Sequence, residues 1–160
     1  MLETKRLMLR SFYDSDIEEL FDYRNNEICA KYQRYKDTSK NYLCKFIDMN
    51  KNIVFLSEEE QHFAIALKSG EIIGDVSIYF QNRTITIGYT ISYKHHRNGY
   101  AFEIISALIE AIHSRYVNYE IIGMIEKENE ASICLLEKLG FINEGYEEKV
   151  KSYIFSLYAN

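Results

Sequence analysis

The 160-residue chain contains no proline, only seven glycines and only three cysteines. Without proline, its turns must rest on glycine, asparagine, aspartate and serine. The cysteines, Cys29, Cys44 and Cys134, are odd in number and lack the close spacing of metal ligands. They predict buried or idle thiols in a reducing compartment. We therefore expect a cytoplasmic protein without a catalytic cysteine.

Long apolar runs and a net positive charge are also missing. No segment approaches the roughly 20 apolar residues that a membrane-spanning helix needs, and no signal peptide precedes the first charged residues. The formal net charge of -5 argues against a nucleic-acid partner. With 47% hydrophobic and 27% charged residues, the composition is that of a globular protein. We expect one domain over residues 1–160, monomeric or homodimeric, with no membrane contact.

The spacing of apolar residues predicts a mixed α/β fold. Expected helices cover residues 15 to about 30, opened by a capping box at Ser15–Glu18, then 40–50, 100–112 and 129–139. Expected strands cover residues 62–67, 71–80, 83–93, 120–125, 142–150 and 153–158, with a further strand near the N-terminus. Hairpin turns at 68–70 and 81–82 make the middle strands an antiparallel meander. The strand, helix, strand unit over 83–125 predicts one right-handed parallel crossover.

The most informative segment is His95-His96-Arg97-Asn98-Gly99-Tyr100-Ala101, which joins a strand to an amphipathic helix through a basic loop. The first N–H groups of a helix are unpaired and its dipole makes that end partially positive, so an anion is stabilised there. Lys94 and Arg97 are expected to add positive charge, and Gly99 to allow close approach of the main chain. An ordinary surface loop with a turn glycine is the alternative. Because adjacent histidines point apart on an extended chain, no metal site is expected.

A second helix has recognisable ends about thirty residues downstream. Asn129 is suited to cap its start, and Gly140 to close it in a left-handed conformation. Phe141 then lies where it packs back on the last turn.

Several segments, taken in order, carry a resemblance to a known family. They are Leu2–Arg10, Phe63–Leu67, Gly70–Gly74, Ile87-Gly88-Tyr89, Gly99-Tyr100-Ala101, Asn129–Ser132 and Glu137–Phe141. Together they resemble the GNAT superfamily of acetyl-coenzyme-A-dependent N-acetyltransferases, and within it the branch of the ribosomal-protein N-terminal alanine acetyltransferases. The resemblance implies an α/β fold with a mixed, mostly antiparallel sheet flanked by helices. In this fold the strand ending near Tyr93 splays from its parallel neighbour ending near Ile125.

This resemblance also implies where acetyl-coenzyme A binds. Where two strands part, main-chain groups lose their ladder partners, and the amides of pantetheine are able to replace them. The implied coenzyme residues are Tyr89, Thr90 and Ile91 for the pantetheine arm and thioester, Asn129 on the opposite wall, and His96, Arg97, Asn98, Gly99, Tyr100 and Ala101 around the pyrophosphate. The family usually has Arg or Gln at the position of His96. Because main-chain donors hold most of the phosphate, we expect the site to tolerate this change.

The implied reaction is attack of a neutral primary amine on the acetyl thioester, which requires loss of an amine proton, an oxyanion donor and an acid for the thiolate. Relatives usually carry acid/base groups where this chain has Thr86, Met124 and Leu136. Ser132 matches the thiolate acid of the ribosomal-protein branch, although a serine also suits a helix start. Glu126 is a weaker candidate base, since a glutamate leaving a strand is commonly a solvated charge.

These features predict acetyl transfer from acetyl-coenzyme A to a primary amine, either a protein N-terminus or a small molecule. The missing acid/base groups leave a second hypothesis, a catalytically weak acyl-coenzyme-A-binding sensor or scaffold. The acceptor is open, because residues 24–61 match no pattern. The basic, aromatic run 31–36 either favours an anionic acceptor or forms a solvated face.

Overall fold

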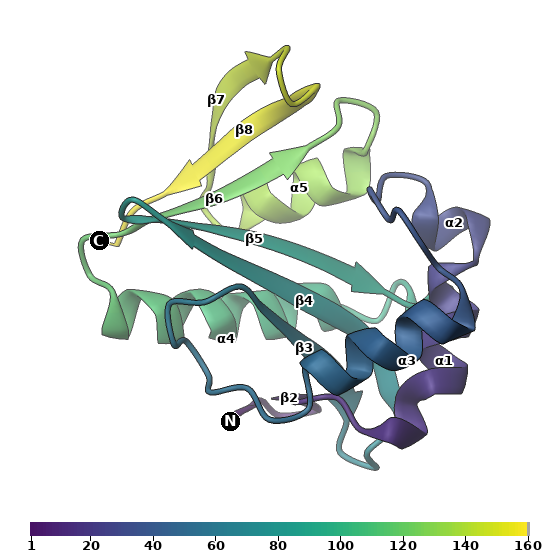
Figure 1. Cartoon of the computed structure of the whole chain (residues 1–160). Coiled ribbons are helices and arrows are strands. Elements are labelled where there is room, and N and C mark those ends of the chain that lie inside the picture. Colours follow the sequence, from purple (N-terminus) through teal and green to yellow (C-terminus); the bar gives the residue numbers. More distant parts are fainter. Residues whose placement is uncertain (160) are drawn as a thin grey trace.

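Eight strands form one mixed sheet in the computed structural model, which describes residues 1–159 (Figure 1). The strands are β1 (Leu2–Glu3), β2 (Leu7–Arg10), β3 (Gln61–Leu67), β4 (Ile72–Gln81), β5 (Thr84–Ile91), β6 (Glu120–Ile125), β7 (Ile142–Glu147) and β8 (Ser152–Leu157). Their order is β1-β2-β3-β4-β5-β6-β8-β7, and within the described residues β5 and β6 form the one parallel pair. The predicted fold class, including the β3–β5 meander, is confirmed.

Helices cover both faces of this sheet. They are α1 (Ile17–Arg24), α2 (Glu27–Ala30), α3 (Lys40–Met49), α4 (Tyr100–Arg115) and α5 (Glu130–Lys138), with short 3-10 turns at Asp14–Asp16 and Tyr93–His95. Side chains of α1 and α3 pack on Ala64 and Ile72 to form one core. The larger core lies on the other face, where α4 and α5 meet the aliphatic side chains of β3, β4, β5 and β6. No helix within residues 1–159 combines the length and apolar character needed to cross a bilayer.

The N-terminal segment departs from the prediction in two ways. The expected first helix is divided into α1 and α2, because the Asn26 side chain accepts the N–H groups of Ile28 and Cys29 and so starts a new helix. The expected capping box at Ser15–Glu18 is absent from this part of the described chain. Asp16 instead accepts the Tyr13 N–H at 2.8 Å and forms an ion pair with Arg10 at 2.8 Å.

The opening strand also folds differently from the prediction. One strand was expected near the N-terminus, but residues 2–10 form the β1–β2 hairpin, in which Leu2 pairs with Leu9. The turn is held by the Thr4 N–H, which donates to the Leu7 carbonyl oxygen at 2.9 Å.

The predicted ends of α5 are confirmed. Asn129 is its N-cap and accepts the Ser132 N–H at 3.3 Å. Gly140 has a φ of +93°, and the Phe141 N–H donates to the Leu136 carbonyl oxygen at 3.0 Å, which closes the helix in a Schellman arrangement. Phe141 is buried in the core.

The predicted splay lies between β5 and β6. The two strands are paired only over Thr84–Thr86 and Glu120–Ile122, although both continue for several residues. Figure 1 shows them diverging toward the end of the molecule at which α2 and the start of α5 lie. The main chain of β5 beyond Thr86 therefore has no ladder partner on this side among the described residues.

Candidate functional site

A cavity of about 520 Å³ lies where β5 and β6 part. It is lined by Ile28, Cys29, Tyr32, Gln33, Tyr89, Thr90, Ile91, His95, His96, Arg97, Asn98, Gly99, Tyr100, Ala101, Phe102, Asn129, Ala131, Ser132 and Leu135. All the residues expected to contact the coenzyme, together with Ser132, are thus brought to one place. Glu126 is not among the lining residues, so the structure does not bring this candidate base to the cavity. We call this space the splay cavity.

The loop before α4 lines this cavity and turns sharply at two residues. Gly99 is the N-cap of α4 with a φ of +75°, and Arg97 also has a positive φ of +62°. Asn98 Nδ2 donates to the carbonyl oxygens of His95 and His96, both at 3.1 Å. Within residues 1–159 no side chain caps α4, so its first N–H groups are available to an anion.

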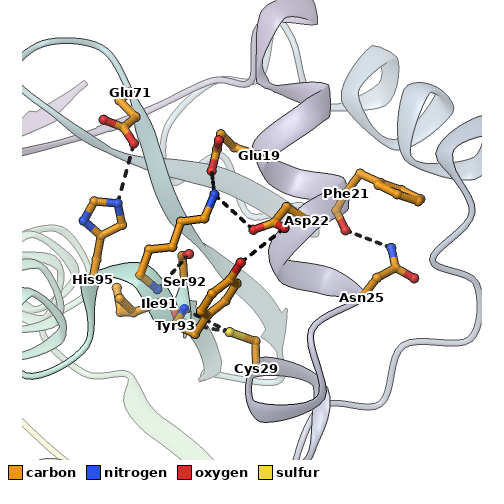
Figure 2. Close-up of polar contacts among 11 residues, drawn as sticks. Glu19, Phe21, Asp22, Asn25, Cys29, Glu71, Ile91, Ser92, Tyr93 and His95 are labelled. Atoms are coloured by element: carbon orange, nitrogen blue, oxygen red, sulfur yellow. Dashed lines mark hydrogen bonds and ion pairs between the residues drawn. The ribbon is translucent and has the colours of Figure 1, made fainter.

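Lys94 was predicted to add positive charge to this loop, but its side chain turns away to α1. Its Nζ lies 3.2 Å from Glu19 Oε2 and 3.3 Å from Asp22 Oδ2, both on α1. Figure 2 shows the same side of α1, where the Tyr93 hydroxyl donates to Asp22 Oδ1 at 3.3 Å. Lys94 therefore anchors the segment after β5 to α1 and does not line the splay cavity.

Arg6 is a second cation near the α4 N-terminus that the sequence did not indicate. Its guanidinium carbon lies 4.6 Å from the centre of the Tyr100 ring, and its Nε lies 2.7 Å from Glu103 Oε2. Burial opposes ionisation of Glu103, but hydrogen bonds from Thr4 and Arg6 outweigh it and lower the pKa of this carboxyl. Arg6 was missed because it is far from the loop in sequence and approaches it only where the β1–β2 turn lies beside α4 in the folded chain.

The main chain of β5 faces the splay cavity at alternate residues. The Ser92 N–H donates to Ile73 of β4 at 2.7 Å, and Thr90 is the register partner of Asp75. Because main-chain groups alternate along a strand, those of Tyr89 and Ile91 point away from β4 into the splay. Their carbonyl oxygens accept bonds from the Gln33 side chain at 3.2 Å and, at 2.8 Å, from His96 Nε2. Thr90 thus offers its side chain, not the expected main chain.

The Tyr89 hydroxyl lies near Ser132 on the α5 side of the splay cavity. The Tyr89 oxygen is buried and has no hydrogen-bond partner of ordinary geometry among residues 1–159. Burial raises the pKa of Tyr89 to about 12, although the nearby Ser132 acts in the opposite direction. Both groups therefore remain protonated at neutral pH and are suited to donate a proton, not to accept one.

The positions at which relatives usually carry acid/base groups offer none here. Leu136 is fully buried in the core, where its Cδ1 lies against Gly123. Met124 is 42% exposed and points away from the core. Thr86 is the last β5 residue paired with β6. None of these three side chains lines the splay cavity.

A second cavity of about 660 Å³ adjoins the splay cavity on the α1 and α3 side of the sheet. Its lining residues are Arg24, Gln33, Arg34, Tyr35, Lys36, Asp37, Tyr42, Phe46, Met49, Asn50, Glu60, His62, Asp75, Ser77, Tyr79, Gly88, Tyr89 and Thr90. Gln33, Tyr89 and Thr90 line both cavities, so the two spaces meet beside β5. Gly88 leaves no room for a side chain at this point of the wall, because a Cβ there would lie 2.7 Å from Ser77 Oγ. We call this space the acceptor-side cavity.

The profile of the acetyltransferase (GNAT) domain matches residues 6–142, which is most of the chain. The chain belongs to the GNAT acetyltransferase family. A curated relative, the uncharacterized N-acetyltransferase YoaA of Bacillus subtilis (strain 168), is 31% identical over 151 residues, covering 91% of this chain and 84% of YoaA.

Solved GNAT structures share the fold over nearly the whole chain. The acetyltransferase (GNAT family) from Bacillus anthracis has a TM-score of 0.84 and 23% identity, covering 98% of this chain and 97% of that one. RimL, a ribosomal L7/L12 alpha-N-protein acetyltransferase in complex with coenzyme A, has a TM-score of 0.78 and 16% identity, covering 98% and 96%. Within residues 1–159 of this GNAT protein, no group of three His, Cys, Asp or Glu side chains is arranged to hold a metal ion.

Proposed function

We propose that this GNAT protein transfers the acetyl group of acetyl-coenzyme A to a primary amine. The observation that carries the proposal is the meeting of the two cavities at Gln33, Tyr89 and Thr90. One cavity has the anion-binding loop and the unpaired strand edge that a coenzyme needs, and the other gives a separate amine access to the same point. The RimL structure, which shares this fold, is a complex with coenzyme A, and this supports coenzyme binding by the present chain.

In this proposal each wall of the splay cavity has one task. The main chain from His96 to Ala101 binds the pyrophosphate, with help from the α4 dipole. The main-chain groups of Tyr89 and Ile91 bind the pantetheine amides once Gln33 and His96 release the two carbonyl oxygens. Asn129 contacts pantetheine from the α5 side. Main-chain N–H groups at the splay stabilise the oxyanion of the tetrahedral intermediate.

Proton transfer is assigned to the hydroxyl groups near the expected sulfur. Ser132 donates its proton to the leaving thiolate, and Tyr89 lies close enough to support it. No strong side-chain base is assigned, and Glu126 is not part of the proposed site. The amine loses its proton through water or arrives partly neutral, so positioning and oxyanion stabilisation supply most of the rate.

Incubation of the protein with acetyl-coenzyme A and pools of primary amines tests this function. The expected result is release of free thiol that depends on one pool, together with an acetylated product 42 mass units heavier than the amine, roughly the mass that replacing a hydrogen by an acetyl group adds. The sensor hypothesis is favoured by the side chains at Thr86, Met124 and Leu136. It predicts tight binding of acetyl-coenzyme A with no thiol release from any pool.

A further inference from the structure

The acceptor-side cavity contains a buried ion pair to which the proposed acetyl transfer assigns no role. Arg24 ends α1 and Asp75 lies on β4, and each residue is 5% exposed. Arg24 Nη2 lies 3.2 Å from Asp75 Oδ2. The guanidinium carbon lies 4.4 Å from the ring centres of both Tyr35 and Phe46, so two aromatic faces fix its position.

This pair leaves much of its hydrogen-bonding capacity unused. Among residues 1–159, Asp75 Oδ2 accepts bonds from Arg24 and from the Tyr23 hydroxyl, whereas Asp75 Oδ1 accepts none. Arg24 uses a single donor, and its buried Nε has no partner. Asp75 Oδ1 and Arg24 Nη1 are not sealed inside the protein. Because a buried ion pair is costly unless its remaining groups are satisfied, a ligand that completes these bonds explains the arrangement.

We propose that the pair recognises the acceptor as a free α-amino acid, with its ammonium on Asp75 Oδ1 and its carboxylate on Arg24. This inference rests on the acetyl transfer proposed above and names its substrate class. An α-amino acid carries opposite charges on neighbouring atoms, which matches two opposite charges side by side on the cavity wall. A guanidinium group also binds a carboxylate through two parallel N–H bonds, a geometry that an ammonium group does not provide.

The position of Asp75 supports this orientation. Asp75 is the register partner of Thr90, which lines both cavities, and the Tyr35 hydroxyl lies 2.9 Å from Thr90 Oγ1. An ammonium group on Asp75 therefore lies at the junction where the thioester is expected. The rest of the cavity, with Tyr42, Phe46 and Tyr79, leaves room for a side chain.

Other amine classes fit the pair less well. A polyamine brings a second cation and no carboxylate, so the buried Arg24 charge stays uncompensated by the ligand. A peptide N-terminus presents an amide where the amino acid has its carboxylate, and a neutral amide oxygen is a weaker partner for guanidinium.

The decisive measurement compares matched acceptors with the wild-type protein. The twenty L-amino acids are tested with saturating acetyl-coenzyme A, followed by the amide and the decarboxylated amine of the best one, and by spermidine. We expect kcat/KM for the free acid to exceed that of its amide by about 10- to 100-fold, the range for losing a charged hydrogen-bond pair. An amide, simple amine or spermidine used as well as the best acid overturns the inference and leaves acetyl transfer standing. No acetylation of any amine overturns both.

Variants of Arg24 test whether this residue is what discriminates between the free acid and its amide. Arg24→Gln should bring the acid-to-amide ratio of kcat/KM close to one, and Arg24→Lys should retain part of it because charge remains without the paired bonds. Lys40→Gln is the charge-matched control, since Lys40 pairs with Glu18 on the exposed side of α3, and its ratio should equal the wild-type value. A rise in melting temperature with acetyl-coenzyme A verifies that each variant is folded. A wild-type acid-to-amide ratio in folded Arg24→Gln overturns the assignment. If Arg24→Gln does not fold, a wild-type acid-to-amide ratio in Arg24→Lys overturns it instead.

Discussion

The left-handed turn at Gly99 provides the sharpest test of the proposed coenzyme site. In Gly99→Val the added Cβ would lie 3.6 Å from Arg6 Nη2, an ordinary van der Waals distance, so the protein itself leaves room for it. The cost to folding is then mainly backbone strain at a φ of +75°, about 1–2 kcal/mol. At roughly 2–4 °C per kcal/mol for a domain of this size, the ligand-free melting temperature should fall by about 2–8 °C.

The effect on coenzyme binding should be larger than the effect on folding. With acetyl-coenzyme A at a hundredfold excess over its Kd, the wild-type protein gains about 2.7 kcal/mol. This corresponds to a rise in melting temperature of about 5–11 °C. Gly99→Val should lose most of this rise, because a branched side chain blocks the main-chain approach that the pyrophosphate needs. His96→Ala should keep most of it, since that ring contacts the Ile91 carbonyl oxygen in the ligand-free protein.

A matched control separates strain from ligand exclusion. Gly70 has a φ of +97° in the β3–β4 turn, and a Cβ added there would meet no atom within 4 Å. Gly70→Val therefore introduces comparable backbone strain away from the splay cavity, and it should retain the full acetyl-coenzyme A effect. Thermal melting with and without ligand, followed by titration calorimetry, measures both quantities. Wild-type affinity in Gly99→Val, or an equal loss in Gly70→Val and His96→Ala, would refute main-chain binding of the pyrophosphate.

Three further outcomes follow from the same geometry. Ser132→Ala should lower kcat by about 10²-fold with a smaller change in acetyl-coenzyme A affinity, as steady-state kinetics and calorimetry will measure; unchanged turnover would leave Ser132 only a helix-start role. The wild-type rate should climb with pH toward the pKa of the acceptor amine, and a plateau set by a group titrating near pH 6–7 would reveal a side-chain base. Burial raises the pKa of Tyr89 to about 12 in the folded protein, above its unfolded value near 10, so its contribution to stability should be complete below pH 10 and lost as pH rises toward 12. Urea unfolding of wild type and Tyr89→Phe at pH 8–11 measures this loss, and parallel pH profiles for the two proteins would contradict it.

The features that the sequence predicted well depend on a few adjacent residues. Asn129 caps α5 and Gly140 closes it because capping geometry involves positions within one turn. The loop at Gly99 belongs to the same class, since a strand end, a glycine and a helix start are contiguous. The helix predicted over residues 100–112 is confirmed as α4, which begins at Tyr100 and continues to Arg115.

The features that escaped prediction depend on side chains brought together from distant segments. Lys94 was expected at the phosphate loop because it is adjacent in sequence, but two carboxylates of α1 lie closer to its ammonium group. Arg24 and Asp75 are about fifty positions apart and meet only after α1 packs on β4. A local motif does not contain this information. The acceptor-side cavity therefore became visible only in the folded chain.

Strand β5 explains why the two cavities meet where they do. Successive residues of a strand point their side chains to opposite faces, and their main-chain groups to opposite edges. Tyr89 and Ile91 direct their main-chain groups into the splay, while Gly88 and Thr90 face the α1 and α3 side and line the acceptor-side cavity. In the proposed reaction, main-chain groups at the edge of this short segment bind the thioester. The amine reaches the thioester along the face of the same segment. A one-residue shift in register between β4 and β5 would exchange these roles, so the β4–β5 pairing determines the arrangement of coenzyme and acceptor as much as any single side chain does.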